Sequence, residues 1–288
     1  MLQQAACIFS LCLIVGFLLV VSPLMAQEAI IVATRNRPDD LKRTVLSIDR
    51  QSNAQERRLI VVDASNRAVF SQNRDLLKNT PCPVDHVRYE GPPSAARQRN
   101  YGIEHLPDSV RFVHFLDDDV TVHSEYFTAL IDFLNHCPPA AGAGGHVDEP
   151  GSSAGDPSPA QRLFLQAAQA RGVVLPSGHT TSAQHVPLSH PVQTDWLNGC
   201  ATYRRVWLDR FRFDSQLVGY APGEDLDLSY RIRQEAPLYV VPSASLTHHR
   251  SPEGRLSTTE YHRLSLIHRY WFVRKNIDHP LCYPAFWW

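Results

Sequence analysis

The sequence predicts an α/β fold built on a mostly parallel sheet with helices on both faces. Apolar and β-branched residues run without interruption through 29–33 and 59–62, as is typical of strands buried on both faces. Apolar residues recur at helical spacing over 41–48, and a third apolar run, 110–115, leads into Asp117. Strands that alternate with helices at this interval indicate a parallel sheet covered by helices.

The elements of the amino-terminal half follow from local signals. Pro38 suits the first turn of the helix over 41–48, and Ser124 is placed as the N-cap of a later amphipathic helix. Between these helices the sequence predicts a strand ending at Asp63, a helix over 67–77, a strand over 84–89, a helix over 93–105 and the strand ending at Asp117. Ligands of such sheets bind beyond the carboxyl ends of the strands, where both aspartates fall.

The segment 138–191 differs in composition from the rest of the chain. It is rich in Pro, Gly, Ala, Ser and His, and outside a short strand over 142–147 it predicts a long mobile loop. The elements expected after it are a helix that follows Gly223 and runs through Arg233, a strand over 238–241 with a loop after it, and a helix opened by the capping box 257–260.

Size and composition are those of an ordinary globular protein. The chain has 288 residues, of which 43% are hydrophobic and 20% charged. A formal net charge of -1 gives no field that would attract nucleic acid, so we expect no nucleic-acid partner. The six cysteines include no C-x-x-C pair, which indicates reduced thiols and a cytoplasmic location rather than a disulfide frame or a zinc site.

Residues 1–26 form a separate hydrophobic segment. Ala5–Met25 is almost wholly apolar and long enough to cross a bilayer. It lacks the basic region of a signal peptide, although Leu24–Ala26 resembles a weak cleavage site. Three interpretations stay open: an anchor through residues 5–25 at the cytoplasmic face of the membrane, a cleaved signal, or an extension upstream of a start at Met25.

The acidic run Asp117, Asp118 and Asp119 is the most informative feature of the chain. Adjacent carboxylates raise one another's pKa unless a cation lies between them. Mg²⁺ and Mn²⁺ prefer oxygen ligands, and ions held by one or two carboxylates complete their coordination with water and substrate phosphates. The run therefore predicts a phosphate-bearing substrate, whereas a solvated acidic turn is the plainer interpretation.

Three further segments carry polar groups suited to a nucleotide. The loop Thr34–Arg37 offers backbone N–H groups and arginines at the sheet edge, and Asp63 can accept hydrogen bonds from a base or ribose. Arg97 and Asn100 are three residues apart, which places them on one helix face. Each of these segments also fits a structural role: a solvated loop, a helix N-cap and an exposed helix surface.

A second acidic cluster, Glu224 and Asp225, is placed at the N-terminus of a helix. The helix dipole there lowers a carboxylate pKa and favours the ionised form that a general base requires. The alternative is a purely capping role. His248 and His249 follow the strand over 238–241, and histidine can complete an oxygen-rich metal site, although adjacent histidines are also common on loop surfaces.

The order of these segments resembles the family 2 glycosyltransferases with the GT-A fold. The resemblance covers roughly residues 29–276 and rests on the succession IIVATRNRP, IVVDAS, SAARQRNYGI, FLDDDV, WLNGCATYRR, GEDLDLSYRI and THHRS. It implies inverting transfer of a sugar, hexosyltransferase-like, from a nucleoside diphosphate donor to a saccharide or lipid-linked hydroxyl acceptor, in cell-envelope polysaccharide or glycolipid synthesis. It also implies Mg²⁺ or Mn²⁺ as the cofactor.

By this resemblance, each candidate residue takes a role. Asp117 and Asp119 form a D-x-D metal and diphosphate site that His248 or His249 completes, and Asp118 contacts the donor ribose. Thr34, Arg35 and Asp63 line the base pocket with Arg97 nearby, and Asp225 or Glu224 is the catalytic base. The implied division of 27–288 is a nucleotide-binding half (27–137), the mobile loop region (138–191) and an acceptor and catalytic half (192–288).

Two other functions compete with this interpretation. A nucleotidyltransferase that makes an activated sugar also places acidic groups near a diphosphate, but its first loop normally contains glycine, which the first loop here lacks. A non-catalytic nucleotide-sugar-binding protein would keep the fold, but both acidic clusters are intact. The terminal aromatic residues of 283–288 suit either a membrane surface or a packed tail.

Overall fold

A computed structural model describes residues 27–149, 159–163, 165–252 and 256–287. Its helices and strands in chain order are β1 (Glu28–Thr34), α1 (Pro38–Asp49), η1 (Ala54–Glu56), β2 (Arg57–Asp63), α2 (Arg67–Leu77), β3 (Val84–Arg88), α3 (Ala95–Glu104), β4 (Phe112–Asp117), β5 (Val120–Val122), α4 (Tyr126–His136), β6 (Gly142–Asp148), α5 (Pro159–Leu163), β7 (Val192–Thr194), β8 (Ala201–Arg204), α6 (Arg205–Arg210), α7 (Glu224–Arg233), β9 (Leu238–His248), α8 (Thr258–Asn276) and α9 (Cys282–Trp287).

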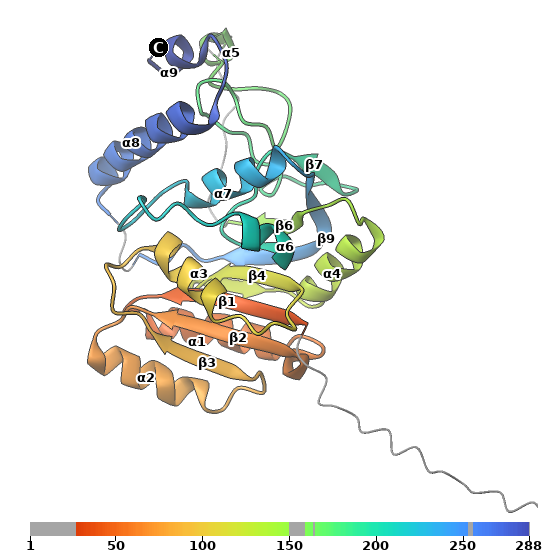
Figure 1. Ribbon diagram of the computed structural model, residues 1–288, viewed down its shortest axis with the longest axis vertical. Helices are drawn as coiled ribbons and strands as arrows, with labels where there is room; N and C mark the ends of the chain where they lie inside the picture. The colour runs from red at the N-terminus through yellow and green to blue at the C-terminus, as the bar shows by residue number, and fades with distance from the viewer. Residues whose placement is uncertain (1–26, 150–158, 164, 253–255, 288) are drawn as a thin grey trace, which may run out of the picture.

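A single sheet of nine strands forms the centre of the molecule (Figure 1). Its order is β3-β2-β1-β4-β8-β6-β9-β5, and β7 pairs with β9. Parallel pairing joins β3, β2, β1 and β4, and also β6 with β9. The strand β8 runs antiparallel to β4 and β6, and β5 and β7 run antiparallel to β9. The predicted α/β fold with a mostly parallel sheet is confirmed.

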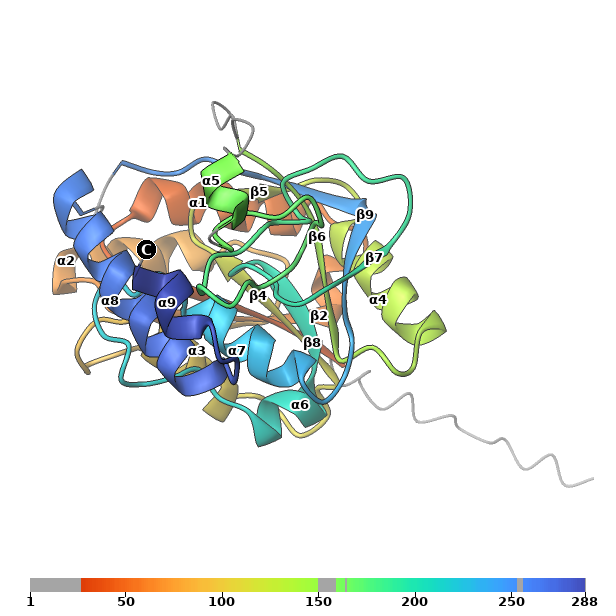
Figure 2. The same cartoon turned by 90° about the horizontal axis from the view of Figure 1, so that it is seen from above.

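Successive residues of β1 enter two different hydrophobic cores. Ile30 and Val32 pack with Leu41 of α1, whereas Ile31 packs with Ile103 of α3. Side chains of a strand point alternately to opposite faces, so each core lies on its own side of the sheet. Figure 2 shows α1 and α3 on opposite sides of β2 and β4, as predicted for a sheet with helices on both faces.

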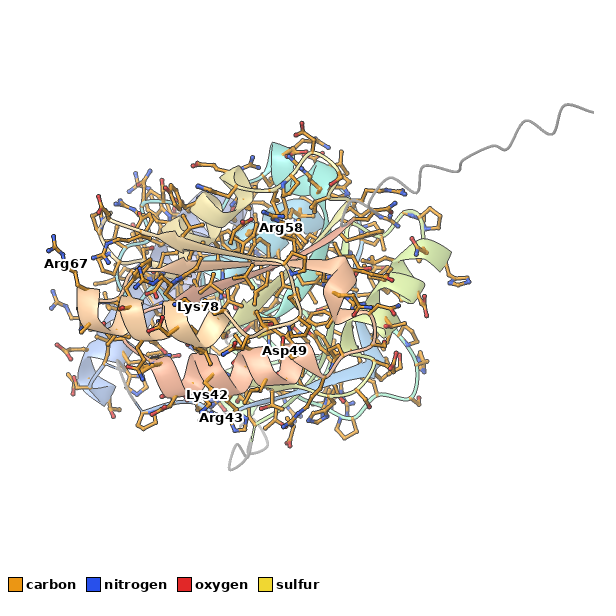
Figure 3. The ribbon with its side chains drawn as sticks, turned by 90° about the horizontal axis from the view of Figure 1, so that it is seen from below. Lys42, Arg43, Asp49, Arg58, Arg67 and Lys78 are labelled. Atoms are coloured by element: carbon orange, nitrogen blue, oxygen red, sulfur yellow. The ribbon has the colours of Figure 1, made fainter. Side chains whose placement is uncertain are left out.

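The helix α1 illustrates how polarity orients a covering helix. Leu41, Val45 and Ile48 are buried, while the side of the helix turned away from the sheet carries Lys42 and Arg43 (Figure 3). This one-sided burial follows the helical spacing of the apolar residues.

Two predicted helix starts are confirmed. Pro38 is the first residue of α1, where its missing N–H costs no helical hydrogen bond. Ser257 and Glu260 form the capping box of α8, with the Ser257 side chain accepting from the Glu260 N–H.

The predicted N-cap of α4, Ser124, is wrong. The helix begins at Tyr126, and the N-cap is Glu125, whose φ of 60° is left-handed and whose side chain makes no capping hydrogen bond. The first N–H of the helix, that of Tyr126, donates instead to Gln51 Oε1 at 3.1 Å. A side chain 75 residues away in the sequence thus replaces the local cap.

The strand β9 is much longer than the predicted 238–241. Its register against β6 shifts between Gly145 and His146, so that Val241 lies opposite Gly145 and Ser245 opposite His146. This irregularity accommodates Pro242 inside the strand, because a bulge tolerates a residue that cannot donate a ladder hydrogen bond. His248 is therefore the last residue of β9, and its predicted position in a following loop is wrong.

The segment 138–191 contains the expected strand near 142–147, which is β6 in the interior of the sheet. Residues 165–191 form no named helix or strand. Gln184 holds them against β6: its backbone oxygen accepts from Val147 N at 2.7 Å, and its side-chain amide donates to Gly145 O at 3.1 Å. The mobility expected of this segment stays a prediction.

The hydrophobic segment 1–26, with its three interpretations, lies outside the described residues. No helix within the described ranges combines the length and hydropathy needed to cross a bilayer. Cys82, Cys137, Cys200 and Cys282 are free thiols, in agreement with the prediction of unpaired cysteines, and Cys7 and Cys12 are not described.

Candidate active site

Strand register collects polar side chains at one edge of the sheet. Thr34 at the end of β1 lies opposite Asp63 at the end of β2, and Ala33 lies opposite Asp117 at the end of β4. The three polar residues end neighbouring parallel strands, so they share the carboxyl edge where ligands of such sheets bind. The predicted position of Asp63 and Asp117 at this edge is confirmed.

Asp117, Asp119 and His248 form a candidate metal centre. Each offers one ligand atom, and these atoms all lie within 4.8 Å of one another. Antiparallel pairing of β5 with β9 sets Val120 opposite His248 and so brings the histidine beside Asp119. Two carboxylates and an imidazole suit Mn²⁺, and the carboxylates alone suit Mg²⁺, so the donor set fits the predicted cofactors.

His249 lies outside this cluster. Its Nε2 atom is 2.7 Å from Thr121 Oγ1, and its backbone N–H donates to Asp119 O at 2.9 Å. Adjacent residues at the end of a strand point to opposite faces, so His248 and His249 cannot both reach the acidic side. The resemblance allows either histidine to complete the metal site, and the geometry favours His248.

The charges of Asp119 and His248 stabilise each other. His248 Nε2 lies 3.2 Å from Asp119 Oδ1. Burial opposes the ionisation of Asp119, but the hydrogen bond and charge of His248 lower the pKa of Asp119 to about 2. Burial likewise opposes the charge on His248, yet its acidic neighbours raise its pKa to about 10. This pair therefore holds a full negative charge on Asp119.

Asp118 points away from the cluster and into the protein. Its Oδ2 accepts from Thr34 Oγ1 at 2.7 Å, its Oδ1 accepts from Arg37 Nη1 at 3.1 Å, and only 5% of the residue is exposed. Burial is the main reason that the pKa of Asp118 rises to about 7. Asp118 thus ties the acidic run to the loop after β1, and its contact with a donor ribose stays a prediction.

Asp63 is fully buried and already has several protein partners. It accepts from Ser65 N at 2.8 Å and Asn73 Nδ2 at 2.8 Å, and its Oδ2 lies 3.0 Å from His86 Nε2. Burial opposes ionisation, but these contacts lower its pKa. Asp63 therefore stabilises the end of β2 beside Thr34. Arg35 is exposed on the loop after β1. Their roles at a nucleotide base stay predictions.

Arg99 is the functional residue that the sequence interpretation missed. Its Nη2 donates to Asp117 Oδ1 at 2.6 Å, and its Nη1 donates to Glu224 Oε1 at 2.9 Å. Arg97, which was selected instead, is partly exposed and donates through Nε to Ser215 O at 2.9 Å. The missed signal was spacing: Ala96, Arg99 and Ile103 share a helix face, so Arg99 is a charge on the buried stripe of α3.

Glu224 and Asp225 begin α7, as predicted. Burial raises the pKa of both carboxyls, against the nearby positive charge of Arg99. The expected lowering by the helix N-terminus is therefore wrong, because desolvation of these carboxylates outweighs the helix dipole. The two carboxylates have different partners. Asp225 Oδ1 accepts from Leu226 N at 2.8 Å, and Glu224 forms the ion pair with Arg99.

Gly199, in the loop between β7 and β8, packs closely against the side chains of Arg99 and Asp117. A Cβ atom there would lie 2.8 Å from Arg99 Nη2 and 3.1 Å from Asp117 Oδ1. These separations are shorter than ordinary van der Waals contact, so a side chain would displace the guanidinium or the carboxylate. The motif WLNGC thus contributes close packing to the site, a role that its sequence alone does not reveal.

Comparison with known proteins bears on the family and the fold of the chain. The model of Glycosyl transferase family 2 matches residues 29–209. No curated sequence matches the chain. Among solved structures, the chain is similar to GalNAc-T7 in complex with UDP, GalNAc and Mn²⁺, with a TM-score of 0.64 and 17% identity over 84% of this chain and 47% of that one.

The chain is also similar to S. aureus TarS. The TM-score is 0.59, with 13% identity over 90% of this chain and 42% of that one. For TarS 1-349 in complex with UDP-GlcNAc the TM-score is 0.60, with 13% identity over 90% of this chain and 70% of that one. The chain therefore spans about half the length of GalNAc-T7 and of the longer TarS structure, and it shares their GT-A fold. By the match over residues 29–209, the chain belongs to glycosyl transferase family 2.

Proposed function

We propose that this protein transfers a sugar from a nucleoside diphosphate sugar to a hydroxyl of a saccharide or lipid-linked acceptor, with inversion. The observation that carries the proposal is the bridge of Arg99 between Asp117 and Glu224, because it brings two acidic clusters into one site. The family match supports a glycosyl transfer, and two of the similar solved structures contain UDP and UDP-GlcNAc, respectively.

Asp117, Asp119 and His248 are the residues that would hold Mn²⁺ or Mg²⁺. A bound ion of this kind neutralises negative charge that develops on a departing diphosphate. Asp118 fixes the acidic run to the rest of the protein by accepting hydrogen bonds from Thr34 and Arg37. We place the nucleoside beside the ends of β1 and β2, where Arg35 is exposed and the buried residues Thr34 and Asp63 end the strands.

We assign the general base to Asp225 rather than to Glu224. Glu224 is the ion-pair partner of Arg99, whereas the Asp225 carboxylate accepts a hydrogen bond from its own helix, at Leu226 N. Burial raises the pKa of Asp225, which makes its carboxylate a stronger base than an exposed one. As the acceptor oxygen bonds to the anomeric carbon, the bond from that carbon to the diphosphate breaks and the acceptor proton passes to Asp225.

A donor panel tests the proposal. The full chain is incubated with UDP-, GDP- and dTDP-sugars, with and without Mn²⁺, and both the melting temperature and the released nucleoside diphosphate are measured. We expect one donor class to raise the melting temperature in Mn²⁺ and to release its nucleoside diphosphate in the presence of a saccharide acceptor. Release of pyrophosphate from a nucleoside triphosphate, or binding without release for every donor, would overturn the proposal.

A further inference from the structure

Glu149, just beyond the end of β6, is a nearly buried carboxylate beside the candidate metal centre. Only 8% of its side chain is exposed. Its Oε1 atom lies 3.0 Å from His248 Nδ1, and its Oε2 accepts from Arg250 Nη2. None of the roles described above uses Glu149.

The two ring nitrogens of His248 face different carboxylates. Nε2 lies 3.2 Å from Asp119 in the metal cluster, and Nδ1 lies 3.0 Å from Glu149 outside it. A metal ion bound at Nε2 would take the place of the proton that the charged imidazole carries there, and Nδ1–H would remain as the donor to Glu149. Partners of this kind orient metal-binding histidines and increase their basicity.

Glu149 is itself fixed from two other directions. Arg250 follows His248 by two residues, and His185 Nε2 lies 3.5 Å from Glu149 Oε1. His185 belongs to residues 165–191, and its Nδ1 lies 2.7 Å from Ser182 Oγ. The carboxylate is thereby held between β9 and the coil that Gln184 anchors to β6.

We propose that Glu149 is a positioning residue that holds His248 in the tautomer and orientation needed to bind the metal ion through Nε2. This inference rests on the proposed metal-dependent function. Because His185 contacts the same carboxylate, it also links residues 165–191 to the metal centre.

Mn²⁺ binding by the full chain tests the inference, with free Mn²⁺ measured by its electron paramagnetic resonance signal. Glu149→Ala is expected to weaken Mn²⁺ binding by about 10–100-fold, and Glu149→Gln by less because it keeps an acceptor for Nδ1–H. The control is Glu235→Ala, which removes an ion pair with Arg210 on an exposed surface and should bind Mn²⁺ like the wild type.

A double variant separates positioning from a general loss of structure. If Glu149 acts through His248, adding Glu149→Ala to His248→Ala causes no further loss of Mn²⁺ affinity. An affinity of Glu149→Ala equal to that of the wild type, or additive losses in the double variant, would overturn the inference alone. If Glu149→Ala does not fold, Glu149→Gln provides the same comparison. Failure of the wild type itself to bind Mn²⁺ would overturn the proposed metal site as well.

Discussion

Arg99 and Glu224 form an ion pair of 2.9 Å across 125 residues of sequence. The guanidinium is 2% exposed and its other terminal nitrogen contacts Asp117, so one buried cation neutralises carboxylates from both halves of the chain. Partnered charges of this kind are tolerated in an interior, whereas a single unpaired charge is not. Arg99 of α3 thus links the start of α7 to the end of β4, in addition to the apolar packing of Leu228 and Ile232 in the core that contains Phe115.

Replacing Arg99 should destabilise the protein strongly. Arg99→Met leaves Asp117 and Glu224 without their shared partner, and we expect the free energy of unfolding to fall by about 3–5 kcal/mol. Urea denaturation measures the loss. Arg97→Met on the same helix is the control, because Arg97 is partly exposed and makes a hydrogen bond to Ser215 O. Equal losses for the two variants would contradict the assigned role of Arg99.

The general base is tested by two carboxamide variants. Asp225→Asn should lower the rate of nucleotide release by about 10²–10⁴-fold, with donor affinity nearly unchanged, because removal of a positioned base affects the proton transfer. Glu224→Gln should retain more activity while lowering stability, since it weakens the ion pair with Arg99. Donor affinity is followed by thermal shift. Normal turnover by Asp225→Asn would exclude this base assignment.

Metal removal gives an independent check on the acidic cluster. We expect a chelator such as EDTA to stop transfer and added Mn²⁺ to restore it, because Asp117, Asp119 and His248 offer a metal donor set. Asp119→Asn should require more Mn²⁺ to reach half-maximal activity. The measurement is the rate of nucleotide release across a Mn²⁺ titration, and full activity in EDTA would contradict the assignment.

Gly199→Ala should reduce both activity and stability. The added methyl group would lie 2.8 Å from Arg99 Nη2 and push the guanidinium off Asp117. Lysine lacks the terminal fork of arginine, so Arg99→Lys removes the atom that the methyl group meets. In kinetic assays the double variant Gly199→Ala with Arg99→Lys should therefore lose less activity than the two single losses combined, although the methyl group still meets Asp117 Oδ1. Additive losses would place the effect of Gly199 elsewhere.

Glu28 predicts an acid-dependent loss of stability far from the site. Burial opposes its ionisation, but His114 and Arg57 lower its pKa to about 2 from an ordinary value of 4.5. Its contribution to stability is present above the unfolded-state pKa and is lost as the pH falls through the folded value. Glu28→Gln should cost roughly 1–3 kcal/mol at pH 6, with a difference from the wild type that shrinks toward pH 2. Urea midpoints measure it, and a constant difference would refute the assignment.

Elements with strong local signals were predictable from the sequence. The apolar runs of β1, β2 and β4 identify strands buried on both faces, and the capping box at Ser257 fixes the start of α8. Local signals gave the wrong boundary where a contact with a distant part of the chain determines where an element begins or ends. Gln51 accepts the hydrogen bond that was expected to go to Ser124 at the start of α4. A register shift between β6 and β9 allows β9 to continue beyond Pro242 to His248.

The same division holds for the candidate site. Asp117, Asp119 and His248 could be selected because their residue types suit a metal, and strand pairing brings them together. Arg99 could not be assigned its partners, because its contacts with Asp117 and Glu224 depend on how α3 and α7 pack. The direction of the Glu224 pKa shift was mispredicted because desolvation depends on tertiary burial, which a helix position does not give.

The register shift at Pro242 determines how the end of β9 would respond to a change in the length of the strand. Residues of β9 beyond it reach the acidic run in a fixed phase, and deletion of one residue there would move each later residue into the place of the one before it. Such a slip would turn His248 away and bring His249 toward Asp119. Because His249 directly follows His248, the candidate metal centre would still have an imidazole ligand after such a deletion. In a strand with a single histidine, the same deletion would remove that ligand.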